Sequence, residues 1–234
     1  MTKQDIRFNE PLYTVNEAAR VIGMPASTLA SWTKGYVRNR GGRPAVIGEA
    51  VVTAFLAEGR CPSIPFIGLA EAMVLAAMRQ SNVPMQRVRP AIAALQSEIG
   101  VVHALASRQL YTDGAEILYD FSAEQVDVDV VASLVVVRNG QRVFVDVVRE
   151  HLKRIEFGSD GYANLIHVPG YRSDVVCDPL RSFGRPIFVR GGTRVDDVIS
   201  RFQTGESIEE LTEEFGMSMA DVEDALRVAS RRAA

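Results

Sequence analysis

The sequence has few features that indicate a metal site, a disulfide or a membrane-spanning segment. Its 234 residues include two cysteines, Cys61 and Cys177, which are too far apart for a metal-ligand motif and are expected to be reduced thiols. The amino terminus has no apolar stretch behind its charges, so no signal peptide is predicted. The longest apolar run, residues 64–78, is interrupted and too short to span a bilayer. We therefore expect a cytoplasmic protein without a membrane segment.

Signatures of catalysis are also scarce. The glycines of Gly191-Gly192-Thr193 have no lysine at the spacing of a phosphate-binding loop. No histidine has a cysteine or a carboxylate cluster at ligand spacing in the sequence, so each is predicted to be a surface or packing residue. Asp127 and Asp129 could mimic a metal pair, but a solvated strand edge is the favoured interpretation. We predict no enzyme activity, no metal and no cofactor, and a nuclease has almost no support.

The composition is that of an ordinary globular protein, with 47% hydrophobic and 24% charged residues. The net charge is only -3, so any binding of nucleic acid must come from a local basic patch. The length is sufficient for two domains, or for one domain with an appendage.

Two stretches of the chain follow the same helix-turn-helix pattern, one at residues 14–29 and one at residues 207–222. Each opens with a hydroxyl residue followed three positions later by glutamate, which is typical of a capping box. Each then has a glycine, Gly23 or Gly216, that can end a helix in the left-handed conformation. We therefore predict two similar helix pairs in different parts of the chain.

The two stretches carry opposite charge. Residues 14–44 contain five basic residues and one acidic residue, whereas residues 204–225 contain eight acidic residues and no basic one. Because DNA is a polyanion, only the first stretch gains from phosphate contacts. The second is predicted to bind protein, through Glu209, Glu210, Glu213 and Glu214, although it could be merely a solvated helix face.

The second helix of the first pair is predicted to begin at Pro25 or Ala26 and to bury Leu29 and Trp32. The basic segment that follows cannot continue this helix through Gly41-Gly42, so it is expected to form a wing or arm, or an ordinary exposed loop. We predict duplex DNA binding, with groove contacts from three hydroxyl residues and phosphate or minor-groove contacts from a basic set around one tyrosine. These residues are Ser27, Thr28 and Ser31 for the groove, and Lys34, Tyr36, Arg38, Arg40 and Arg43 for the basic set.

Hydrophobic periodicity predicts a mainly α fold with small β-hairpins, of the α+β class. The predicted helices are 68–79, 84–99 with a stop at Gly100, about 146–155, and three near the carboxyl end. Those three have apolar stripes over 195–202, 208–215 and 222–229, with caps at Ser207, at Thr193 paired with Asp196, and at Ser218 paired with Asp221. The predicted strands are 115–119, 134–137, 142–145 after Asn139-Gly140, and 165–168 after a turn at Asp160-Gly161. A boundary at Pro169-Gly170 divides the chain into domains 1–169 and 170–234.

Several runs resemble known families. The run from Tyr13 to Gly23 with Trp32, and the runs 64–71 and 87–92, are similar to a MerR-like DNA-binding domain. A second set resembles a small domain of formerly unknown function found in prokaryotic antitoxins: Asp178-Pro, Phe183-Gly-Arg185-Pro, Gly192-Thr193-Arg194, Gly205-Glu-Ser-Ile, Phe215-Gly-Met and Asp221-Val222. The extra glycine, Gly191, departs from the usual pattern only in its local loop. The whole chain resembles a long, two-domain VapB-type antitoxin of mycobacterial type.

The resemblance implies an operon-autoregulating repressor that also neutralises a PIN-domain ribonuclease toxin. Such toxins hold metal ions in a carboxylate cluster, which an inserted arginine can block by charge-assisted hydrogen bonds. Candidates are Arg227, Arg231 and Arg232, and also Arg181 and Arg185. We also expect a homodimer, because a two-fold protein can read two operator half-sites. The alternative is a stand-alone, ligand-responsive MerR-like regulator.

Overall fold

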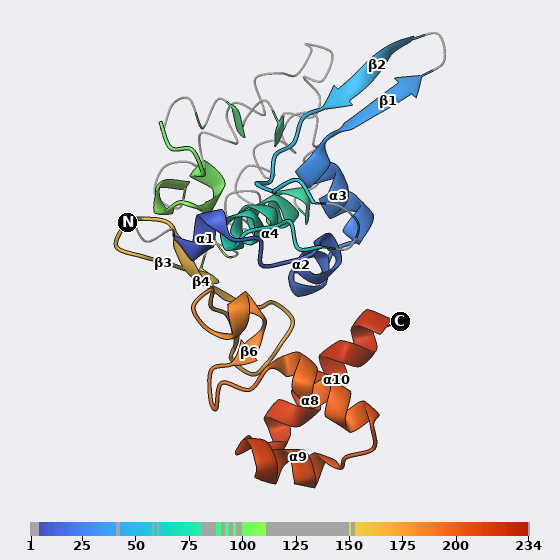
Figure 1. Ribbon diagram of the computed structural model, residues 1–234, viewed down its shortest axis with the longest axis vertical. Coiled ribbons are helices and arrows are strands. Elements are labelled where there is room, and N and C mark those ends of the chain that lie inside the picture. The colour runs from blue at the N-terminus through green and yellow to red at the C-terminus, as the bar shows by residue number, and fades with distance from the viewer. Residues whose placement is uncertain are drawn as a thin grey trace, which may run out of the picture.

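The molecule is elongated, with its carboxyl-terminal helices at one end (Figure 1). The computed structural model describes residues 5–40, 43–57, 59, 61–80, 88–89, 92–93, 96, 100–110, 150 and 153–233. Helices and small antiparallel sheets together make an α+β fold, as predicted. In this part of the chain no helix is both long and apolar enough to cross a lipid bilayer.

The amino-terminal elements are packed around one buried helix. They are α1 (Ile6–Asn9), α2 (Val15–Ile22), α3 (Ala26–Lys34), β1 (Tyr36–Arg40), β2 (Arg43–Gly48), α4 (Phe66–Gln80) and the 3-10 helix η1 (Ala104–Ala106). Every residue of α4 from Phe66 to Met78 is buried, as its all-round apolar sequence predicts. Val88 and Ile92 are buried and Gly100 has a φ of 68°, in agreement with the predicted helix 84–99 and its stop.

Some predicted elements fall outside the described residues. These are most of helix 84–99, the strands 115–119, 134–137 and 142–145, the turn at Asn139-Gly140, and the pair Asp127 and Asp129.

A four-stranded antiparallel sheet joins the two ends of the molecule. Its strands lie in the order β3 (Ile155–Phe157), β4 (Ala163–His167), β5 (Val175–Cys177) and β6 (Ile187–Phe188). The predicted hairpin is confirmed, with Gly161 at a φ of 81° in the turn between β3 and β4. The predicted extension of the preceding helix to Ile155 is wrong, because Ile155 pairs with Ile166 as the first residue of β3. The predicted boundary at 169/170 lies between β4 and β5, and the division into two domains stays a prediction.

The carboxyl-terminal part contains the three predicted helices, α8 (Val195–Gln203), α9 (Ile208–Phe215) and α10 (Met219–Ala233). The predicted cap of α10 is confirmed, since Ser218 and Asp221 exchange hydrogen bonds. The predicted cap of α8 at Thr193 is wrong. Thr193 instead accepts a bond from the Phe188 amide, 2.9 Å long, and the cap position is taken by Arg194 without a side-chain bond. Tertiary pairing of the backbone thus overrides the local capping signal.

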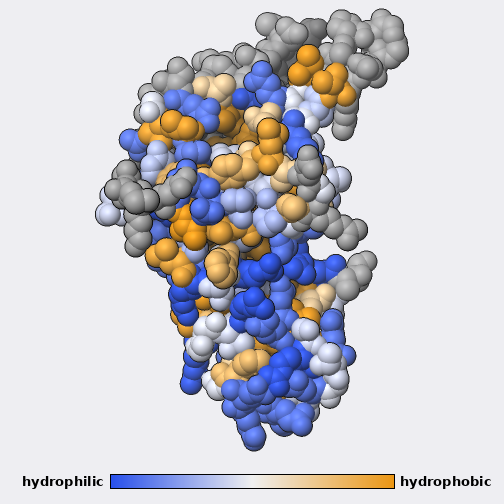
Figure 2. Space-filling model, viewed as in Figure 1, coloured by the Kyte–Doolittle hydropathy of each residue, from blue (hydrophilic) through white to orange (hydrophobic). Residues whose placement is uncertain are grey.

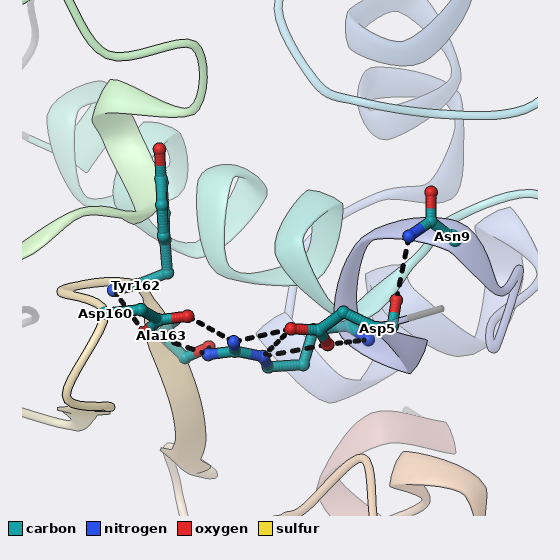
Figure 3. A network of polar contacts seen from close by, with 6 residues as sticks. Asp5, Asn9, Asp160, Tyr162 and Ala163 are labelled. Atoms are coloured by element: carbon teal, nitrogen blue, oxygen red, sulfur yellow. Dashed lines mark hydrogen bonds and ion pairs between the residues drawn. The ribbon is translucent and has the colours of Figure 1, made fainter. Parts of the chain in front are cut away.

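The short helix α1 is held against the β3–β4 hairpin by one arginine. The guanidinium of Arg7 forms ion pairs with Asp5 and Asp160 and donates to the Ala163 carbonyl. In Figure 3 Asp5 approaches from the α1 side, and Asp160 and Ala163 approach from the hairpin side. The side-chain hydrogen bonds, together with the opposite charges, raise the pKa of Arg7 and lower the pKa values of both aspartates.

Contacts between α2 and the carboxyl-terminal part fix how the two parts meet. The hydroxyl of the buried Tyr13 donates to the Gly184 carbonyl at 2.7 Å. Arg185 pairs with Glu17 at 3.0 Å, and Arg20 pairs with Asp196 at 3.3 Å. A β-carbon added to Gly184, whose φ is 74°, would lie only 2.3 Å from the Tyr13 hydroxyl oxygen. This close approach requires glycine.

Candidate nucleic-acid interface

Helices α2 and α3 form the predicted helix-turn-helix. At its start the Thr14 amide and hydroxyl donate to the Glu17 carboxylate at 2.8 and 2.9 Å, and the Glu17 amide donates back to Thr14 Oγ1 at 3.2 Å. This is a complete capping box. Gly23 then ends α2 in the left-handed region with a φ of 79°, so the chain can turn into α3 within three residues.

Helix α3 has one buried face and one polar face. Leu29 and Trp32 are buried, as predicted. Ser27 and Lys34 are exposed on the polar face, whereas Thr28 and Ser31 are half-buried at its margin. The Ser31 hydroxyl donates to the Thr28 carbonyl at 2.7 Å, as serines within helices often do. The exposed face is therefore small and polar, as a helix that enters a DNA groove requires.

The basic segment after α3 forms a two-stranded wing, β1–β2. Its backbone pairs Tyr36 with Gly48 and Arg40 with Arg43, with an irregularity between Arg38 and Arg40. The predicted wing is thus confirmed as a β-hairpin, and its strands contain Arg38, Arg40 and Arg43. In Figure 1 the wing extends away from the rest of the molecule beside α3.

The base of the wing is fixed to α3 and α4. The amides of Val51 and Val52 both donate to the Trp32 carbonyl, at 2.8 and 3.2 Å. Close by, the buried Glu71 of α4 accepts bonds from the Thr53 amide and hydroxyl, at 2.7 and 3.1 Å, and contacts His103 at 2.9 Å. The position of the wing relative to α3 is therefore set by hydrogen bonds at its base.

Two arginines that the sequence analysis missed lie beside the polar face of α3. Exposed Arg79, in the last turn of α4, donates to Thr28 Oγ1 at 3.0 Å. The guanidinium of Arg89 lies 5.3 Å from the centroid of the Tyr36 ring, and its Nη2 is 3.5 Å from the Ser31 carbonyl. Its Nε and Nη1 are buried and have no hydrogen-bond partner among the described residues. Both arginines come from distant parts of the chain, so no local pattern indicates their contribution.

The second helix pair, α9–α10, repeats this backbone geometry. The three capping bonds between Ser207 and Glu210 again measure 2.8, 2.9 and 3.2 Å, and Gly216 has a φ of 61°. The face corresponding to the polar face of α3 is nevertheless occupied. At the position that matches Ser31, the buried carboxylate of Asp224 accepts bonds from the amides of Arg172 and Ser173 at 2.6 and 2.9 Å.

Most of the acidic residues in this pair act within the fold. Glu206 and Glu214 pair with Arg201, Glu210 and Asp221 cap helices, and Asp224 holds a loop, which accounts for five of the eight. Glu209 and Glu213 are exposed and form no salt bridge with a described residue. In Figure 2 hydrophilic colour predominates at the lower end of the molecule, where α8, α9 and α10 lie.

The arginines predicted to contact the toxin differ in their availability. Arg227 pairs with Asp224 and donates to the Gly170 carbonyl at 3.0 Å, and Arg232 lies 5.4 Å from the centroid of the Tyr171 ring. Arg231 is exposed and forms no salt bridge with a described residue. Arg227 and Arg232 are thus already engaged by other residues of the chain.

One histidine has acidic neighbours that the sequence did not reveal. His167 on β4 contacts Asp174 through Nδ1 at 2.9 Å and Glu156 through Nε2 at 3.0 Å. Burial by itself lowers the pKa of His167, but the hydrogen bonds with both carboxylates outweigh it, so its pKa is raised. Among the described residues no three His, Cys, Asp or Glu side chains assemble into a possible metal site.

Both parts of the chain match models of known protein families. Residues 11–92 match a family model described as "Putative DNA-binding HTH domain", and residues 175–229 match "Protein of unknown function (DUF433)". The chain is 41% identical over 228 residues to "Putative antitoxin VapB45" of Mycobacterium tuberculosis, covering 95% of each protein. It is 27% identical to "Uncharacterized protein Rv2308" of the same organism, covering 94% of this chain and 90% of that protein.

A solved structure has the same architecture. The crystal structure of Rv2018 from Mycobacterium tuberculosis matches with a TM-score of 0.74 and 33% identity, covering 94% of this chain and 99% of that one. The similarity extends along nearly the whole length, so it includes both the helix-turn-helix part and the three-helix end. The chain belongs to the VapB family of antitoxins, in the form that combines an amino-terminal helix-turn-helix domain with a carboxyl-terminal DUF433 domain.

Proposed function

We propose that this protein neutralises a PIN-domain ribonuclease toxin by direct binding and represses its own operon by binding DNA. The observation that carries the DNA-binding part is the polar face of α3 beside a wing whose strands contain three arginines. The antitoxin part rests on the 41% identity to a protein named as a VapB antitoxin. No step of this function needs catalysis by the chain itself.

In the DNA complex α3 lies in the major groove with Ser27, Thr28 and Ser31 toward the base edges. Lys34 and the wing arginines, Arg38, Arg40 and Arg43, neutralise phosphates on the flanking backbone, and Tyr36 packs at the base of the wing. Arg79 adds a further cation next to Thr28. Contacts to phosphate position the protein, and contacts to bases provide the sequence preference.

The test is the triple variant Arg38→Ala, Arg40→Ala, Arg43→Ala, measured on duplex DNA from the region upstream of the chain's own gene. Each phosphate contact that is lost reduces the salt dependence of binding by about one unit of slope. We expect a slope lower by up to about three and weaker binding to all sequences. Arg231→Ala, which removes an exposed arginine near the carboxyl end of α10, is the matched control. Unchanged affinity and salt slope in the triple variant would refute the DNA-binding assignment.

The active species is a homodimer, so that two copies of α3 reach two half-sites of one operator. The three-helix end is small and buries a limited share of its surface alone, which favours self-association. Sedimentation at micromolar concentration is expected to give twice the chain mass, with or without toxin. A monomer mass in both cases would contradict this.

A further inference from the structure

The turn between β5 and β6 has an unusual backbone. Ser182 and Phe183 lie within the 3-10 helix η4 (Ser182–Gly184) and have φ angles of 47° and 53°. Among the described residues, these two are the non-glycine residues with a positive φ. Residues with a β-carbon rarely adopt this region, and a bulky aromatic residue is an outlier there. Such strain persists only where surrounding contacts enforce it, and it concentrates at sites of binding.

This turn holds two large apolar side chains in solvent. Leu180 is 82% exposed and Phe183 is 76% exposed, although the flanking strands β5 and β6 are completely buried. A hydrophobic residue that is kept outside by a strained backbone gains nothing for the fold of the isolated chain. Neighbouring apolar side chains that are exposed and rimmed by polar residues instead mark a protein interaction site.

Contacts with the rest of the molecule make the turn rigid. The Leu180 amide donates to Asp178 Oδ1 at 2.9 Å, and the Gly184 amide donates to the Arg181 carbonyl at 3.0 Å. The bond from Tyr13 to the Gly184 carbonyl then fixes its carboxyl end. A turn whose backbone is already fixed loses little conformational entropy when a partner covers it.

The same region is basic. Residues 179–195 contain four arginines and no acidic residue. Arg185 pairs with Glu17 and Arg194 with Asp197, but Arg181 and Arg190 are exposed and form no salt bridge with a described residue. The Arg181 guanidinium lies near Gly192, so this turn and the one at 189–192 are neighbours, and the second adds Val189, which is 44% exposed.

We propose that the surface formed by Leu180, Arg181, Phe183, Val189 and Arg190 docks on the toxin. Phe183 enters an apolar pocket of the toxin, and the two arginines pair with carboxylates at the rim of that pocket. This proposal rests on the proposed function and adds to it the surface used and the chemistry of the partner.

Charge argues for this occupant over two others. In a two-fold contact between copies of this chain the surface would face itself, which would bring Arg181 and Arg190 close to their own counterparts and cause repulsion. DNA would satisfy the arginines, but phosphates offer no pocket for Leu180 and Phe183. A protein with an apolar depression bordered by acidic residues can bind both the arginines and the two apolar side chains.

The experiment measures binding of the full-length protein to the purified PIN-domain protein encoded beside its gene. Phe183→Ala is expected to weaken binding about 30-fold, the loss typical of a central interface residue. Phe183→Gly should weaken binding similarly and yet melt no lower than the unmodified protein, because glycine adopts a φ of 53° without strain. Phe202→Ala, which removes an exposed phenylalanine from α8, is the matched control and should change affinity less than twofold.

The outcomes separate this proposal from the proposed function. If the unmodified protein binds the toxin and Phe183→Ala binds it equally well, the docking surface is wrong and the antitoxin function remains intact. If the unmodified protein does not bind the toxin, the function falls and the docking surface falls with it. Loss of DNA affinity, or a changed sedimentation mass of the chain alone, with toxin binding unchanged would assign the surface to DNA or to a second copy.

Discussion

The two helix pairs, α2–α3 and α9–α10, differ in what their second helix presents. The backbone is set in both by the same capping box and the same left-handed glycine, with equal capping distances. In the first pair the outer face of the second helix is polar and partly open. In the second pair that face is covered by the loop that Asp224 holds. Local sequence therefore specifies the turn, and tertiary contacts decide whether the turn can be used for binding.

The largest expected difference in stability is between substitutions at the matching positions Ser31 and Asp224. Asp224→Ala should lower the free energy of unfolding by about 3 kcal/mol, because it leaves the Arg172 and Ser173 amides without their acceptor and removes the carboxylate paired with Arg227. Ser31→Ala should change it by less than about 0.5 kcal/mol, since only a bond within α3 is lost. Urea denaturation measures both. Equal losses of stability in the two variants would show that Ser31 on α3 and Asp224 on α10 lie in similar environments.

The pH dependence of stability sharpens the same contrast. Burial alone raises the pKa of Asp224, but the amide and arginine hydrogen bonds outweigh it, so its pKa is lowered. Its contribution to stability is therefore present above its ordinary pKa of about 4 and is lost as the pH falls through the lower folded value. Asp224→Asn should lose less stability than the unmodified protein on acidification, whereas Ser31→Ala should follow the unmodified profile. Thermal melts between neutral and acidic pH test this.

The capping boxes should be of equal strength. Thr14→Ala and Ser207→Ala are each expected to cost about 1 kcal/mol, because each removes the acceptor of one helix amide in the same geometry. The two losses in the free energy of unfolding, measured by thermal denaturation, should differ by only about a few tenths of a kcal/mol. A much larger loss for Thr14→Ala would mean that contacts to the rest of the molecule, such as the Glu17–Arg185 pair, contribute to the first cap.

The smallest effect on stability is expected at the acidic face of α9. Reversal of Glu209 and Glu213 to Lys should leave the melting temperature unchanged, whereas reversal of Glu210 and Glu214 should lower it, since these two act in the cap and in the pair with Arg201. The first variant isolates the effect of charge on toxin association. If the acidic face attracts the toxin, association slows at low salt and little at high salt. Unchanged rates would make this face a solvated surface.

Features encoded by neighbouring residues could be predicted from the sequence. The capping boxes, the glycine stops, the hairpin at Asp160-Gly161 and the wing after α3 each depend on a few consecutive residues. The errors occurred where backbone pairing prevailed over the local helix signal, at the start of β3, where Ile155 pairs with Ile166, and at the cap of α8, where the Phe188 amide bonds Thr193. Phe202 was expected in the apolar stripe of α8 and is 40% exposed. The contributions of Arg79 and Arg89 beside α3 depend entirely on such distant contacts, so no local pattern could indicate them.

The close approach of Tyr13 and Gly184 has a consequence for protein engineering. The aromatic hydroxyl occupies the space that any side chain at position 184 would need. A chimera that keeps Tyr13 in its helix-turn-helix part must therefore also have glycine at position 184 in its carboxyl-terminal part. We expect a hybrid that places a larger residue at 184 opposite this tyrosine to melt at a lower temperature than one that keeps the glycine, even when each half retains its own core.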